Sequence, residues 1–378
     1  MSIKKTYITT VKPFELSQKE KLGEKWLVLE RDSDCSVFLS WHWIGNWLDL
    51  VTDKLFLIEA YHDDKVVGLG FFVEKTRKVF GCFSIKQWWL HRTGIQQQDQ
   101  IWVEYNDFLL DESCSVTVRE EMVKAIADFD PSVKEVIIGL SAFEKLDFFT
   151  NSFAKLNFLE DSIVQTNGYL VSLSCFKGDY LNKVLSKNTR LQISRSKKIL
   201  QSQGQLRFEV FSNPQKLAEL YPKIASIHID KWQASKEGSG FSNPIFAGFH
   251  QSMAINNTNN LVQISVLTLD EVELGYLVNF VYNNKVYFYL SALQQNSDNK
   301  IKIGLTLHSE AIRYYAEQGI ESYDFLGGDA RYKKSLSNKK YGLEMKCYYR
   351  DDFLLRLERQ LKDFKMRSIQ MFSKYLKS

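Results

Sequence analysis

The side chains best suited to chemistry in this sequence are concentrated in residues 322–335. This segment reads Ser-Tyr-Asp-Phe-Leu-Gly-Gly-Asp-Ala-Arg-Tyr-Lys-Lys-Ser. Its first part predicts a short strand, 323–326, in which Asp324 lies between two aromatic residues and which ends at the turn Gly327-Gly328. Glycines let a ligand or another backbone approach closely. We therefore interpret the segment as a functional site; the alternative is a solvated turn followed by a basic tail.

The loop after this turn adds a second carboxylate and several cations. Asp329 comes directly after the glycines, and Tyr332 and Lys333 follow it. Such a set fits positioning chemistry, in which a carboxylate base and cationic side chains act together in a cleft.

A second candidate site precedes an expected helix at 304–318. The residues before it, 298–303, include Lys300 and Lys302. The first N–H groups of a helix have no partner within the helix, so this place favours an anion such as a pyrophosphate. The alternative is a basic loop that only caps the helix.

Residues 183–207 hold seven lysines or arginines and no acidic residue. Apolar residues are interleaved with them, which predicts a helix with one cationic face that includes Arg190 and Arg195. The face is either a grip for a phosphate or another anionic substrate, or a solvated surface. A further helix, 221–232, places His228 and Trp232 four residues apart on one side.

The elements that must position these residues form an internal repeat. Asp63-Asp64-Lys65-Val66-Val67-Gly68 and Asp270-Glu271-Val272-Glu273-Leu274-Gly275 predict the same hairpin turn, and each is followed by further strand, one amphipathic helix and one strand. The first copy is expected to contain strands 55–61, 65–73, 78–83, 85–90 and 134–140, helices 116–129 and 142–156, and a strand 168–173. The second copy is expected to contain strands 262–269, 273–282, 285–292, 321–327 and 341–349, with the helix 304–318.

The repeat predicts an α+β protein of two packed halves. We expect an N-terminal half at 1–166, a C-terminal half at 167–350 that carries the polar site, and a C-terminal amphipathic helix within 351–378.

Composition excludes several classes of protein. The 378 residues are 44% hydrophobic with a net charge of +4, so nothing in the overall charge demands nucleic acid. Five widely spaced cysteines lack a C-x-x-C pair, which predicts neither disulfides nor a metal site and fits a reducing cytoplasm. We expect no signal peptide and no membrane span. The motifs of nucleotide hydrolysis, dinucleotide binding, zinc proteolysis and serine hydrolysis are absent from the sequence.

Taken together, the sequence resembles the GNAT-fold acyltransferases of the CelD-like group, which serve cellulose and exopolysaccharide biosynthesis and are related to the FemAB aminoacyltransferases. The resemblance rests on these features in this order: Phe38-Leu39-Ser40-Trp41 with Trp43, Val67-Gly68, Asn106-Asp107-Phe108, the basic helix 189–200, His228 with Trp232, Phe249-His250, Ser291 and the motif 323–333. It implies two tandem GNAT-like halves, each a mixed and mostly antiparallel sheet flanked by helices, with a shared cleft.

The resemblance also implies an activity, namely transfer of an acyl group from acyl-CoA to an amine or hydroxyl of a sugar, an amino acid or an envelope precursor. The pyrophosphate loop of the family, Q/R-x-x-G-x-G/A, corresponds to residues 300–306, where Gly304 matches. The implied roles are a general base at Asp324 or Asp329; phosphate binding by Lys300, Lys302, Gly304 and Thr306; and an acceptor pocket of Asp107, Arg190, Arg195, His228, Trp232, Tyr332 and Lys333.

Two alternatives stay open at this point. A FemAB-type enzyme would transfer an aminoacyl group from tRNA to a peptidoglycan precursor, and the basic helix would then meet tRNA phosphates. A non-catalytic scaffold of a polysaccharide synthesis complex would use the C-terminal helix, which could lie on an anionic membrane face. The sequence leaves the oligomeric state open.

Overall fold

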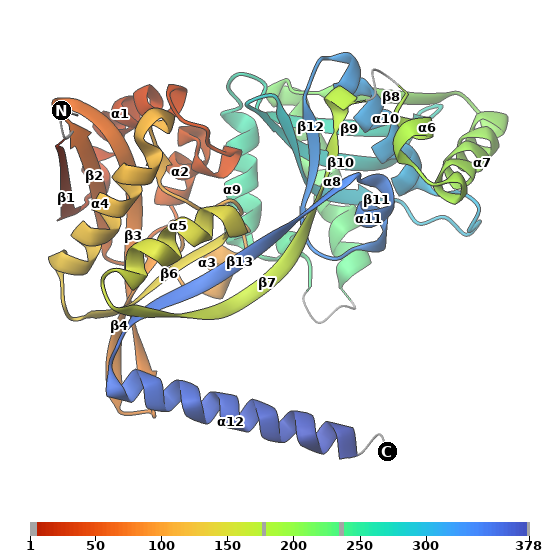
Figure 1. Ribbon diagram of the computed structural model, residues 1–378. Coiled ribbons are helices and arrows are strands. Elements are labelled where there is room, and N and C mark those ends of the chain that lie inside the picture. The colour runs from red at the N-terminus through yellow and green to blue at the C-terminus, as the bar shows by residue number, and fades with distance from the viewer. Residues whose placement is uncertain (1–5, 176–178, 234–237, 376–378) are drawn as a thin grey trace.

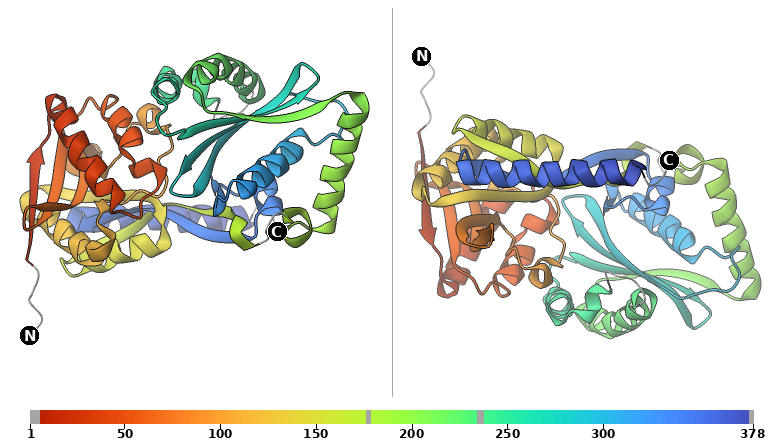
Figure 2. Two further views of the ribbon diagram at one scale, coloured as in Figure 1. Left: turned by 90° about the horizontal axis from the view of Figure 1, so that it is seen from above. Right: turned by 90° about the horizontal axis from the view of Figure 1, so that it is seen from below.

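A single mixed sheet of thirteen strands runs through the part of the chain that the structure, a computed structural model, describes: residues 6–175, 179–233 and 238–375 (Figure 1). The order along the sheet is β1-β2-β3-β4-β6-β13-β7-β12-β11-β10-β9-β8, and β5 pairs with β3. Helices cover both faces of the sheet at each end (Figure 2). The last expected residues of the C-terminal segment, 376–378, lie outside the described residues.

The first half contains the following elements in chain order: β1 (Tyr7–Pro13), α1 (Lys19–Arg31), α2 (Trp41–Leu48), β2 (Leu55–His62), β3 (Lys65–Val79), β4 (Phe83–Leu90), α3 (Gln96–Asp99), β5 (Leu109–Leu110), α4 (Ser115–Phe129), β6 (Val133–Ala142), α5 (Phe143–Ala154) and β7 (Phe158–Ser172).

The second half continues with α6 (Tyr180–Val184), α7 (Lys187–Gln203), β8 (Leu206–Phe211), α8 (Pro214–Trp232), α9 (Pro244–Ile255), β9 (Val262–Leu269), β10 (Val272–Tyr282), β11 (Lys285–Leu293), α10 (Ile303–Glu317), β12 (Ser322–Gly327), α11 (Arg331–Leu336), β13 (Lys339–Arg350) and α12 (Phe353–Tyr375).

The expected repeat is present as a repeated order of elements. The hairpins β2–β3 and β9–β10 are each followed by a third strand, a helix, a strand that is parallel to that third strand, a second helix and a long final strand. Two tandem α+β halves are therefore the architecture of this chain, as the sequence predicts.

The final strands of the two halves are exchanged. β13, which ends the second half, pairs with β6 of the first half, whereas β7, which ends the first half, pairs with β12 of the second. β7 and β13 also pair with each other over most of their length and so join the two halves. The expected boundary between residues 166 and 167 falls inside β7.

Two strand ends differ from the sequence prediction. β3 continues to Val79, and the chain turns at residues 80–82, where Phe80 and Gly81 have positive φ. β7 begins ten residues earlier than the expected 168. Its early part, 159–165, is exposed and its apolar residues Leu159, Ile163 and Val164 do not alternate with polar ones, so it lacks the pattern by which a strand is recognised. Its partner β13 is also distant in sequence.

Each half contains one place where two parallel strands diverge. In the first half the pairing of β4 with β6 ends at Trp89 and Ile137. Beyond this point the buried Asn106 amide donates to Leu90 O at 2.6 Å and to Gly139 O at 3.1 Å, and so closes the gap between the strands. His91 Nε2 accepts from Phe71 N–H, so its Nδ1 donates to Asn106 Oδ1 at 3.1 Å.

In the second half the pairing of β11 with β12 ends at Tyr287 and Asp324. The ladder between β10 and β11 skips Tyr289, which lies in a bulge just beyond this point. Beyond this point β11 and β12 diverge toward a cavity.

The halves also pack against each other through a shared apolar core. This core contains residues of α1, α2, β2 and β3 from the first half and of α8, α9 and β9 to β11 from the second. Fully buried Trp43 of α2 packs its ring against Phe249 of α9 and Phe280 of β10, at centroid distances of 4.9 and 5.5 Å. The two halves are therefore fixed relative to each other.

Replacing Asn106 with alanine should lower the free energy of unfolding by about 3 kcal/mol, because it leaves the Leu90 and Gly139 carbonyls and the His91 N–H buried without a partner. Urea unfolding followed by circular dichroism measures this change. Asn188→Ala, at an exposed position of α7, is the matched control and should change the value by less than about 0.5 kcal/mol. Equal effects of the two substitutions would contradict the role assigned to Asn106.

Candidate functional site

The carboxylate of Asp324 lies buried where the two halves meet. Its side chain is fully buried in β12. Oδ1 accepts from the Tyr341 hydroxyl at 2.6 Å and from Leu326 N–H at 2.8 Å, and Oδ2 accepts from the Tyr105 hydroxyl. A buried charge requires such donors, and here they come from three separate segments of the chain.

The backbone around Asp324 is shaped to allow these contacts. Leu326 has a φ of +60°, which is uncommon for a leucine and lets its N–H turn back to Asp324. Gly168 of β7 lies under the ring of Tyr341, where an added Cβ would come within 2.1 Å of Tyr341 Cζ. Only glycine at 168 therefore leaves room for this tyrosine.

Glu104 lies beside Asp324 and comes from the first half. Its half-buried carboxylate accepts from Gly327 N–H at 2.8 Å through Oε2. Burial raises the pKa of Glu104 to about 7, although the Gly327 N–H and nearby Lys333 favour its charged form. Glu104 can therefore exchange a proton near neutral pH.

Lys333, in α11, completes this group. Its Nζ donates to Gly327 O at 2.5 Å, so Glu104 and Lys333 bind the N–H and the carbonyl of the same residue. Burial lowers the pKa of Lys333, while Glu104 and Asp324 oppose that change. Two carboxylates are thus close enough to favour the charged form of Lys333.

A cavity of about 450 Å³ opens on these residues at the divergence of β11 and β12. Tyr289, Leu326 and Gly327 line it from the diverging strands, and its charged lining residues are Glu104, Lys333 and Arg92. The Tyr289 hydroxyl donates to Ile101 O at 2.6 Å, which ties the bulged strand to the first half. The arrangement can bring a substrate carbonyl and a proton acceptor together.

A second cavity, of about 620 Å³, shares Arg92, Trp102 and Met345 with the first. We call it the tryptophan groove, because Trp89, Trp102 and Trp232 line it. Trp102 has a φ of +47°, a strained conformation that is common at functional sites.

His228 also lines the tryptophan groove. It shares a hydrogen bond of 2.7 Å between its Nδ1 and Ser239 Oγ, and it stacks on Trp232 with the rings 27° apart. Burial lowers the pKa of His228 to about 4, so the ring is neutral near pH 7.

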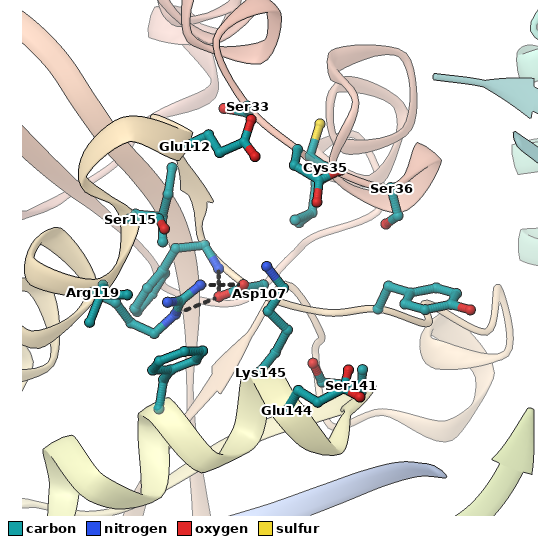
Figure 3. Close-up of a pocket in the computed structure, with 18 of the residues that line it drawn as sticks. Ser33, Cys35, Ser36, Asp107, Glu112, Ser115, Arg119, Ser141, Glu144 and Lys145 are labelled. Carbon is teal, nitrogen blue, oxygen red and sulfur yellow. Dashed lines mark hydrogen bonds and ion pairs between the residues drawn. The ribbon is translucent and has the colours of Figure 1, made fainter. Parts of the chain in front are cut away.

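A third cavity, of about 520 Å³, is lined by Asp107 and Tyr105 among others (Figure 3). Asp107 forms a bidentate ion pair there with buried Arg119 of α4, at 3.1 and 2.6 Å. Figure 3 shows Lys145 reaching from α5 toward this pair. Asp107 thus lies near the cleft but is engaged with Arg119.

Other predicted residues lie away from Glu104. Asp329 is exposed. Its carboxylate accepts from the Tyr169 hydroxyl at 2.6 Å and from the Asn167 amide at 2.9 and 3.1 Å, and these hydrogen bonds lower the pKa of Asp329. Tyr332 stacks on buried His308 with the rings 21° apart. Arg190 donates to the Leu185 and Asn182 carbonyls.

The predicted phosphate site lies at the start of α10. Lys300 is exposed and Lys302 half-buried. Ser196 of α7 accepts from Lys302 N–H at 2.9 Å, and it shares a 2.9 Å hydrogen bond with the buried Thr306 hydroxyl. Gly304 packs closely, since an added Cβ would come within 2.9 Å of Leu293. Helix packing therefore engages part of this site, and Arg195 remains on the exposed side of α7.

The structure thus brings Asp324 and Lys333 together with residues that sequence reasoning did not assign to the site. These are Glu104, Tyr105, Tyr289 and Tyr341. The polar segment 104–107 ahead of an apolar strand was a signal for the first two. No sequence pattern marks the two tyrosines, which lie within ordinary strands.

Residues 187–334 match the family model of the acetyltransferase (GNAT) domain. No curated protein sequence matches the chain. Among solved structures, FemX is similar over 89% of this chain and 98% of its own, at 11% identity and a TM-score of 0.61.

Two further solved structures are similar. The C-terminal domain of a putative lysylphosphatidylglycerol synthetase from Agrobacterium fabrum covers 87% of this chain and is itself covered to 92%, at 12% identity and a TM-score of 0.52. A conserved protein of unknown function from Bacteroides thetaiotaomicron is similar over 91% of this chain and 100% of its own, at 12% identity and a TM-score of 0.53. Together with the repeated elements, these findings confirm the tandem GNAT-like fold.

In the described part of the chain, no three histidine, cysteine or acidic side chains gather as they would around a metal ion. None of the helices within the described ranges is both long and apolar enough to cross a membrane.

Tyr341→Phe should lower the free energy of unfolding by about 2 kcal/mol, because the buried Asp324 carboxylate then loses one charge-assisted donor. Chemical denaturation measures the loss. Tyr332→Phe serves as the control, because it removes a hydroxyl from another ring that packs against the core. It should lower the free energy of unfolding by less than about 0.5 kcal/mol. A smaller loss for Tyr341→Phe than for Tyr332→Phe would contradict this account of Asp324.

Proposed function

We propose that this protein is an acyltransferase that moves an acyl group from a thioester, in the first instance acyl-CoA, to an amine or hydroxyl of an envelope or polysaccharide precursor. The observation that carries the proposal is Glu104, whose pKa of about 7 places a proton acceptor in the cavity where β11 and β12 diverge. The match of residues 187–334 to an acetyltransferase domain supports the same class of reaction.

In the proposed reaction the acceptor nitrogen or oxygen attacks the thioester carbonyl. A carbon–nitrogen or carbon–oxygen bond forms, the carbon–sulfur bond breaks, and Glu104 takes the proton that the acceptor loses. This proton then passes to the departing thiolate through solvent. The geometry favours Glu104 over Asp324 as the base, because three donors already occupy the Asp324 carboxylate.

Lys333 acts as a positioning residue in this proposal. Its ammonium lies near Glu104 and holds the carbonyl of Gly327, while the N–H of Gly327 holds Glu104. Tyr289 lies in a bulge of β11 and lines the same cavity, so its peptide groups are the candidates to stabilise the oxyanion that forms on the thioester carbonyl.

The tryptophan groove is the proposed path of the acceptor. Indole rings offer flat apolar surfaces that stack on the apolar faces of sugar rings, and Arg92, Asp99 and His228 add polar groups between them. The groove joins the cavity that contains Glu104, so a bound saccharide could present its amine or hydroxyl there. A cytoplasmic location belongs to this proposal.

A second candidate donor is an aminoacyl-tRNA. The start of α10 is partly engaged by Ser196, while the neighbouring α7 exposes Lys187, Arg195 and Lys198. This cationic surface suits a polyanion better than a single pyrophosphate. FemX shares the fold over nearly the whole chain, which supports keeping this alternative beside acyl-CoA.

Glu104→Gln should reduce kcat/KM by roughly 10² to 10⁴, because it removes the proposed base without changing the shape of the side chain. Thiol release, measured across acyl-CoA donors with amine and sugar acceptors, reports the rate. Activity of the unchanged protein should be lost as the pH falls through about 7, since protonated Glu104 cannot accept a proton. The Gln variant should lack this dependence.

Three further variants complete this experiment. Glu209→Gln, at an exposed position of β8, is the control for the change of charge. Asp324→Asn and Asp329→Asn test the two carboxylates that the sequence alone suggested as the base. Full activity of Glu104→Gln together with loss in Asp329→Asn would overturn the assignment of the base to Glu104.

If aminoacyl-tRNA is the donor, its binding should weaken steeply with added salt, because each phosphate contact releases counterions. Arg195→Ala and Lys198→Ala together should then reduce tRNA affinity and flatten the salt dependence, whereas thiol release from acyl-CoA should be absent. Filter binding at several salt concentrations measures the effect. Thiol release with no tRNA binding would decide against this donor.

A further inference from the structure

The apolar side of α12 faces away from the body of the protein. Phe353, Leu357, Leu361 and Phe364 lie at the spacing of one helical stripe. Phe353 is 81% exposed, Leu361 51% and Phe364 71%. An amphipathic helix of a globular protein normally buries its apolar stripe against the core. In α12 this stripe is instead exposed to solvent.

A different side of α12 anchors the helix. Leu355 is fully buried in a small core with Val79 and Tyr349. Glu358 accepts from Arg77 at 2.9 and 2.7 Å, and Arg359 donates to Glu135 Oε1 at 2.9 Å. These contacts fix the first turns of α12 and leave its apolar stripe pointing outward.

A second exposed apolar element lies at the same end of the molecule. The turn between β3 and β4 presents Phe80 and Phe83, both about half exposed. It directly follows Val79, which packs against the first turns of α12. Figure 1 shows this hairpin and the start of α12 together at the lower end of the protein.

The charge of this segment identifies the occupant. Residues 353–378 contain seven lysines or arginines and two acidic residues, an excess larger than the net charge of +4 of the whole chain. A second copy of the helix would bring like charges together, whereas an anionic lipid surface complements them. Lys365 is exposed beside the apolar stripe, whereas Lys362, also exposed, lies on the anchored side and pairs with Glu358 at 3.0 Å. A cation beside an exposed apolar stripe is typical of helices that lie in a membrane interface.

We propose that α12, together with the Phe80 and Phe83 turn, binds the surface of a membrane that contains anionic lipids. The apolar stripe lies in the headgroup region, and the cations contact lipid phosphates. The helix lies on the membrane and does not cross it. This inference is independent of the acyl-transfer reaction, since it rests on the other end of the fold and is tested by binding alone.

Co-sedimentation of the full chain with vesicles tests the proposal. We expect binding to vesicles of phosphatidylglycerol and phosphatidylcholine, weaker binding as salt is added, and little binding to phosphatidylcholine alone. Phe364→Glu should weaken binding by roughly tenfold to a hundredfold, because it removes a large apolar contact and adds a negative charge. Its side chain is exposed, so the variant should fold normally.

Val272→Glu is the matched control, because it places the same charge on an exposed apolar residue at the β9–β10 turn. It should bind the mixed vesicles as the unchanged protein does. Equal weakening by both variants, or no binding of the unchanged protein to the mixed vesicles, would overturn the proposal. Self-association that Phe364→Glu abolishes, without vesicle binding, would assign the stripe to a second copy instead.

Discussion

The buried charge of Asp324 is the constraint on which the cleft depends. A carboxylate in a dry interior needs donors, and this one takes them from the first half through Tyr105, from β13 through Tyr341 and from its own strand through Leu326. These contacts fix where the halves meet. They also turn the chain so that Gly327 offers its N–H to Glu104 and its carbonyl to Lys333.

The two halves share one plan, but the space between the diverging strands is used differently in each. In the first half the amide of Asn106 spans the strands and fills the space between them. In the second half a cavity remains at the same place. A single short segment is responsible for both outcomes, since Asn106 closes the first gap and Glu104, two residues earlier, lines the second. The first half therefore supplies a charged group to the cavity of the second.

The sequence predicted those features that depend on local pattern. The hairpin turns, the amphipathic helices and the repeat all follow from residues that are neighbours in the chain. Asp324 was recognisable because a carboxylate between aromatic residues of a strand is unusual. The hydrogen bond between Glu104 and Gly327 could not be predicted, because 223 residues separate the two and no pattern in the sequence indicates that these segments meet. The early part of β7 was missed for a related reason, since pairing with β13 rather than burial makes it a strand.

The exchange of β7 and β13 has a consequence for how the protein comes apart. Each half completes its sheet with a strand that belongs to the other, as subunits do in a domain-swapped dimer, except that here one chain provides both partners. A single cut in the connection between the halves would leave two fragments that still hold each other by backbone hydrogen bonds. Neither fragment alone could fold without exposing an unpaired sheet edge, so the halves should form and unfold as one cooperative unit.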